Sequence, residues 1–61
     1  MRTFSVFIED ERYSVPTLMF VVAADELRAR ELAIRELDAS KNHLSVEVQE
    51  SGQFLFRQTR A

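Results

Sequence analysis

The 61-residue chain has no cysteine and only one histidine, one glycine and one proline. Without cysteine it cannot form a disulfide, and one histidine, His43, cannot complete a structural zinc site. A single glycine, Gly52, excludes the glycine-rich loops that hold phosphates in common nucleotide sites. We therefore expect no metal, no cofactor and no disulfide framework.

Long apolar segments are also missing. No apolar run approaches the roughly 20 residues that span a bilayer. The first residues, MRTF, do not begin the long apolar segment of a signal peptide. We expect a cytoplasmic protein without membrane contact.

The composition is that of an ordered globular protein, with 46% hydrophobic residues, 30% charged residues and a net charge of -2. This negative balance gives no general attraction for a polyanion such as nucleic acid. Residues 1–61 are expected to form a single domain, near the lower size at which one hydrophobic core can hold a fold. Because disulfides and metals are excluded, an efficiently packed core or self-association must supply the stability.

Two strands are predicted before the helix. Residues 4–9 (FSVFIE) alternate, with an apolar face and one apolar residue, Phe7, on the opposite face. Residues 17–23 (TLMFVVA) are apolar on both faces, one formed by Leu18, Phe20 and Val22 and the other by Met19, Val21 and Ala23. Such a strand needs cover on both sides. Pro16 cannot donate to a ladder, so it is expected at a strand start, a bulge or an edge.

Asp25 is the best N-cap candidate for a helix over residues 26–39, a segment rich in strong helix formers. The apolar side chains of this helix form one broad arc centred on Ala33. Ala29 and Ala33, in the middle of the arc, would let the helix lie close to a sheet.

A hairpin is predicted after the helix. Residues 43–49 (HLSVEVQ) alternate cleanly, and Gly52 indicates a tight turn because glycine can take the left-handed conformation that short hairpin loops require. Residues 54–57 return as the last strand, with Phe54 and Phe56 inward. Residues 58–61 are expected to fray.

These elements predict an α+β fold of order ββαββ, in which a four-stranded mixed sheet has one helix packed on one face. The helical crossover joins the second and third strands and should leave these two strands parallel. The pattern does not determine the order of the strands across the sheet.

The acidic residues and the histidine do not form a recognisable catalytic site. Residues 9–11 (EDE) are interpreted as solvated charges, since nothing would bury or pair them as an acid/base dyad requires, and their spacing is not that of a calcium loop. Ser40 and Ser45, near His43 in sequence, carry no nucleophile motif. We expect a protein that is not an enzyme and has no catalytic residues.

Three arginines offer an alternative function. Arg57 and Arg60 lie beside two phenylalanines of the last strand, and Arg2 could come close to them in the sheet. A basic and aromatic strip of this kind can stack bases and contact phosphates. The alternative is therefore a small nucleic-acid-binding or regulatory domain. It competes with the stronger interpretation that the phenylalanines belong to the core.

The face of the sheet that one helix cannot cover gives the strongest functional indication. Parity places four apolar residues there, namely Phe7, Met19, Val21 and Leu55. A contiguous exposed apolar patch is typical of an interaction surface. We therefore predict a protein-interaction module that forms a homodimer through this face. The alternative is that residues 10–16 or the C-terminal tail fold over the patch.

The stretches VVAADELRARELAIREL (residues 21–37) and SVEVQESGQFLF (residues 45–56) resemble the pattern in small uncharacterised bacterial ββαββ proteins. In these, an apolar strand leads to a helix with spaced alanines and a closing hairpin with one glycine. The resemblance implies this fold and a bacterial, cytoplasmic setting, and it supplies no catalytic residue. Residues 17–23 depart from the pattern, in which the second strand is more polar.

Overall fold

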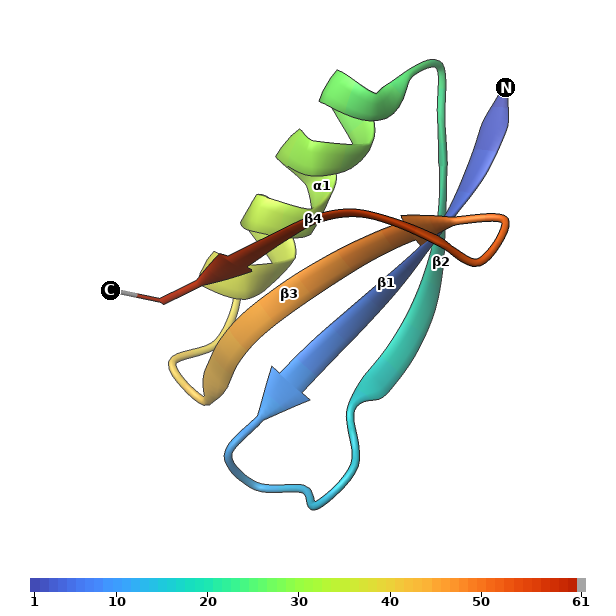
Figure 1. Cartoon of the computed structure of the whole chain (residues 1–61). Helices are drawn as coiled ribbons and strands as arrows, with labels where there is room; N and C mark the ends of the chain where they lie inside the picture. The colour runs from blue at the N-terminus through green and yellow to red at the C-terminus, as the bar shows by residue number, and fades with distance from the viewer. Residues whose placement is uncertain (61) are drawn as a thin grey trace.

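The computed structural model describes residues 1–60, which form a four-stranded sheet with one helix against one face (Figure 1). The elements are β1 (Arg2–Asp10), β2 (Thr17–Ala23), α1 (Glu26–Asp38), β3 (His43–Glu50) and β4 (Gln53–Thr59). The predicted α+β class, the ββαββ order and the single covering helix are confirmed. No helix within residues 1–60 is long and apolar enough to cross a membrane.

The strands lie in the order β2-β1-β3-β4, and every neighbouring pair is antiparallel. β2 and β3 run in the same direction, as expected for strands joined by a helical crossover, but β1 lies between them. The pairing therefore differs from the predicted mixed sheet. Two antiparallel ladders to β1 take the place of a parallel ladder between β2 and β3.

The core lies between α1 and the two central strands. Its largest fully buried side chains are Phe4 and Val6 of β1 and Val46 and Val48 of β3. On the helix side, Ala29, Ala33 and Leu37 are buried. Alanine has no side chain beyond Cβ, so the helix approaches the sheet closely, as its sequence predicts.

Both ends of α1 are held by side chains. At the N-terminus, the predicted N-cap Asp25 accepts a hydrogen bond of 2.9 Å from the Arg28 amide. At the other end, Arg60 donates from its guanidinium to the carbonyl oxygens of Leu37, Ser40 and His43. The last carbonyls of a helix have no partner within it, so an arginine supplies the missing donors.

The C-terminal segment is correspondingly more ordered than predicted. β4 continues to Thr59, and the Arg60 amide donates a hydrogen bond of 2.9 Å to the Leu44 carbonyl oxygen. The prediction that residues 58–61 fray is wrong for residues 58–60, because strand pairing and the helix end hold them. Ala61 lies outside the described residues.

A two-residue turn joins β3 to β4. Ser51 has a φ of 52° and Gly52 a φ of 77°. Positive φ at both central residues is what a type I′ hairpin requires, so the turn predicted at Gly52 is confirmed. A Cβ at Gly52 would meet no atom within 4 Å, so backbone conformation and not crowding favours glycine there.

β4 contains a β-bulge. Val48 lies opposite Phe56, but the next residue, Gln49, lies opposite Phe54, which leaves Leu55 as the extra residue. Phe56 is buried, Leu55 packs partly buried against the core, and Phe54 is exposed. The predicted alternation is therefore wrong for Phe54 and Leu55, because an inserted residue reverses the faces that follow it.

Candidate interaction site

The face of the sheet opposite α1, here called the open face, carries exposed apolar side chains on β2. Directly opposite residues of antiparallel strands share a face. Phe20 lies opposite Ser5 and Leu18 opposite Phe7, and these β1 residues point away from the helix. Leu18, Phe20 and Val22 are 48%, 66% and 57% exposed. These three residues of β2 are the apolar stripe.

Of the four residues predicted to form the patch, only Phe7 lies on the open face. Met19 lies opposite the buried Val6, so Met19 and, two residues on, Val21 face the helix. Both are partly buried against the core, as is Leu55 beside the bulge. The predicted placement on the uncovered face is therefore wrong for Met19, Val21 and Leu55.

The register between β1 and β2 explains this difference. Ile8 lies opposite Thr17, so each odd-numbered residue of β2 shares a face with an even-numbered residue of β1. A slip of one residue would turn Met19 and Val21 to the open face. Residues 17–23 are apolar on both faces, so their periodicity does not show which face meets the core.

Beyond the apolar stripe the open face is largely polar. The Arg57 guanidinium lies 3.6 Å from Glu9 Oε1 and donates a hydrogen bond of 3.3 Å to Ser45 Oγ. Glu47 of β3 lies directly opposite Arg57. The exposed Phe54 stands on the strand at the far edge of the sheet. The apolar stripe is flanked on β1 by Thr3, Ser5 and Phe7, and the charged groups lie farther across the sheet, on β3, β4 and the end of β1.

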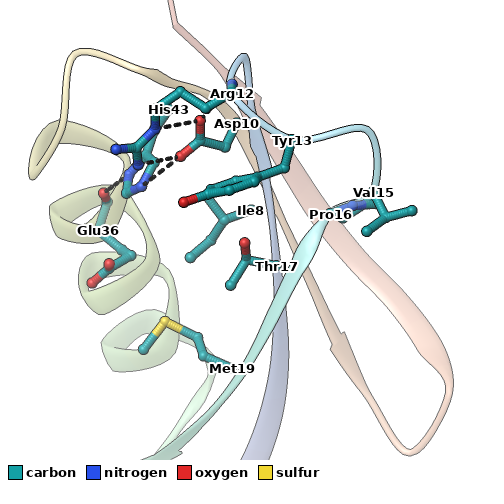
Figure 2. A pocket seen from close by; sticks show the side chains of 10 residues that line it. All are labelled: Ile8, Asp10, Arg12, Tyr13, Val15, Pro16, Thr17, Met19, Glu36 and His43. Atoms are coloured by element: carbon teal, nitrogen blue, oxygen red, sulfur yellow. Dashed lines mark hydrogen bonds and ion pairs between the residues drawn. The ribbon is translucent and has the colours of Figure 1, made fainter.

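Neither cover considered from the sequence lies over the apolar stripe. Figure 2 shows Tyr13 of the loop extending across Ile8 toward α1, on the helix side of the sheet. Arg60, at the C-terminal end of the described chain, lies against the end of α1. Leu18, Phe20 and Val22 consequently remain exposed.

A groove of about 530 Å³ lies on the helix side, between the loop, the start of β2 and the C-terminal half of α1 (Figure 2). Ile8 and Met19 contribute apolar surface to it. At one end, the buried Asp10 carboxylate accepts hydrogen bonds from the Arg12 amide at 2.8 Å and from its guanidinium at 3.0 and 2.7 Å. The hydrogen bonds from the Arg12 side chain lower the pKa of Asp10 from 3.8 to about 2, against the opposing effect of burial.

His43 links this ion pair to the helix. Its Nδ1 lies 2.7 Å from the Glu36 carbonyl oxygen. A carbonyl oxygen only accepts, so Nδ1 carries the hydrogen and Nε2 faces Asp10 Oδ2 at 3.6 Å. Asp10, Arg12 and His43 thus all find partners within the chain, and together they fasten the loop to the end of α1.

The serines considered as nucleophiles lie elsewhere. Ser40 Oγ accepts a hydrogen bond of 3.2 Å from the Asn42 amide, and Ser45 Oγ lies beside Glu9 on the open face. The structure therefore pairs neither hydroxyl with His43. Among residues 1–60, no three histidine, aspartate or glutamate side chains are placed to hold a metal ion.

The structure separates the three arginines of the nucleic-acid alternative. Arg2 makes a two-point pair with Glu50 at 2.8 and 2.6 Å, which lowers the pKa of the Glu50 carboxyl. Arg57 lies on the open face beside Glu9, and Arg60 caps the helix. Each guanidinium has a partner within the chain, and the three do not line one surface. No pattern in the sequence indicates these pairings, since the partners are distant along the chain.

Comparison with known proteins gives no match to any family model, any curated protein or any solved structure. Function must therefore be inferred from the surface itself.

Proposed function

We propose that this chain is a non-enzymatic protein-interaction module that self-associates through the apolar stripe of its open face. The observation that carries the proposal is the exposure of Leu18, Phe20 and Val22, which stand in a row on one strand and are each about half exposed or more. Single exposed apolar residues are ordinary on a protein surface, but a contiguous row is not.

The small core supports the proposal. Of the ten buried hydrophobic residues among residues 1–60, three are alanines, namely Ala23, Ala29 and Ala33. A fold of this size gains little stability from its own core. Burying a large apolar side chain contributes about 1.5 to 3 kcal/mol. In a two-fold dimer each residue of the apolar stripe contributes at two equivalent positions, so self-association adds apolar contact that the limited core lacks.

Sedimentation equilibrium tests the proposal. We expect the parent chain to show a concentration-dependent dimer in the micromolar range. Phe20→Asp should shift the population to monomer, because the carboxylate would have to be desolvated in the interface without a partner. Phe20 is 66% exposed, so the same substitution should leave the monomer folded.

Leu27→Asp is the matched control. Leu27 is 67% exposed but lies on the first turn of α1, away from the sheet, where an acidic residue is favourable for the helix dipole. This variant should dimerise like the parent. A parent chain that stays monomeric at several hundred micromolar would refute the proposal, as would a Phe20→Asp variant with unchanged dimerisation.

A further inference from the structure

We propose that β2 of one copy pairs edge to edge with β2 of a second copy, antiparallel and centred on Phe20. This inference rests on the proposed function and specifies its partner: the apolar stripe meets the same strand of another chain. The interface would then be a backbone ladder that joins two sheets into one, and not two open faces stacked on each other.

The first support is the lack of protection on this edge. β2 is an edge strand, and Thr17–Ala23 contains no charged residue, no glycine and no proline. Soluble proteins usually block a sheet edge with charges, bulges or prolines, because its free backbone groups recruit other strands. The other edge, β4, has a bulge at Leu55 and a charge at Arg57. β2 is therefore the edge available for pairing.

The second support is that β2 is complementary to itself. Phe20 is the middle residue of the seven in the strand. An antiparallel pair centred there sets Phe20 opposite Phe20, Leu18 opposite Val22, and Met19 opposite Val21 of the second copy. Every such pair is apolar, and each joins residues of the same sheet face. The two-fold axis is then perpendicular to the sheet, so both helices lie on one side.

The third support comes from the flank of α1 that faces β2. Leu32 packs partly buried against the core, and Glu36 lines the groove together with Met19. The helix begins at Glu26, just after β2 ends at Ala23, and runs back over the sheet, where it packs on β3 and on β2. Leu32 is six residues into α1, about 9 Å along its axis, which corresponds to about three residues of strand and places Leu32 near the level of Phe20.

Charges on the flank of α1 that faces β2 are complementary under the two-fold axis of the proposed pair. Arg28 and Glu36 stand four residues to either side of Leu32, on one stripe of the helix. A two-fold axis at the level of Leu32 sets Arg28 of one copy toward Glu36 of the other, twice. Within the chain, Arg28 reaches only Glu31, at 3.9 Å, where both side chains are about half exposed. Such a pair is weak and can exchange partners.

Single cysteines test the register directly, because the parent chain has none. In the proposed pairing, residue 20 lies directly opposite its own copy, within the Cα separation of about 7 Å that a disulfide tolerates. Residue 18 is displaced from its own copy by four residues, or about 13 Å, but lies opposite residue 22. Phe20→Cys should therefore cross-link to itself under mild oxidation.

Leu18→Cys and Val22→Cys are the matched controls, since each also removes one residue of the apolar stripe. Alone, each should give on the order of ten-fold less covalent dimer than Phe20→Cys, and their equimolar mixture should recover cross-linking as a mixed dimer. Circular dichroism of the reduced variants confirms that all three fold. Stacked open faces would lie about 10 Å apart and would not permit any of these disulfides.

The outcomes separate this inference from the proposed function. A parent that dimerises by sedimentation while Phe20→Cys stays uncross-linked would overturn the edge pairing and leave self-association intact. Cross-linking of Leu18→Cys alone as efficiently as Phe20→Cys, or no cross-linking in the mixture, would also overturn the register. A parent chain that stays monomeric would refute both the edge pairing and the proposed self-association.

Discussion

Phe54 and Phe56 are two residues apart on β4 but lie on opposite faces of the sheet. Phe56 is 9% exposed and belongs to the core, whereas Phe54 is 57% exposed. In a regular strand two such residues share a face. The bulge at Leu55 separates them, because one strand contributes an extra residue to the ladder at this point.

The two phenylalanines should therefore respond differently to the same substitution. Phe56→Leu removes ring atoms from the core and should lower the free energy of unfolding by about 1 to 2 kcal/mol. Phe54→Leu should change it by less than about 0.5 kcal/mol. Urea denaturation of both variants at the same low protein concentration measures the difference. Equal losses in the free energy of unfolding would contradict the placement of the bulge.

Acidification should destabilise the fold through the ion pair of Asp10 with Arg12. The pKa of Asp10 is lowered to about 2 in the folded chain, from 3.8. A depressed carboxyl pKa contributes stability that is fully present above the unfolded value and is lost as the pH falls through the folded value. Thermal melting should therefore show a falling midpoint between about pH 4 and pH 2. Glu50, whose pKa Arg2 lowers, adds a loss of the same sign.

Asp10→Asn separates this contribution from general acid denaturation. The variant should be less stable than the parent at pH 6, and its loss of stability on acidification should be smaller. Glu11→Gln, which removes an equal charge next to the pair, is the control and should retain the slope of the parent. A parallel pH dependence of Asp10→Asn and the parent would show that the ion pair does not contribute.

Arg60 should act as a cap for the helix. Arg60→Met removes the hydrogen bonds to the carbonyl oxygens of Leu37, Ser40 and His43, and we expect a loss of about 1 to 2 kcal/mol in the free energy of unfolding. Arg57→Met is the control, because Arg57 takes part in an exposed ion pair worth less than about 1 kcal/mol. Equal effects of the two substitutions in urea denaturation would argue against the cap.

Features with local causes could be predicted from the sequence. Asp25 caps the helix because its carboxylate lies within one turn of the free amides, and the helix starts at Glu26 as predicted. Gly52 marks the turn because a positive φ is costly for most other residues. The alternation of apolar and polar residues in β1 and β3 correctly predicted which face of each strand is buried, since the other face of each strand is polar or nearly so.

The free surface of β2, in contrast, depends on how the strands pair. Leu18 and Met19 are similarly apolar, so hydrophobicity alone does not orient the strand. The pairing of Ile8 with Thr17 orients it, through the conformation of the loop that joins β1 to β2. Leu55 turned inward for a similar reason, because a bulge is a property of two paired strands. The partners of Arg2 and Arg60 also lie far away along the chain, and proximity of that kind arises only when the sheet assembles.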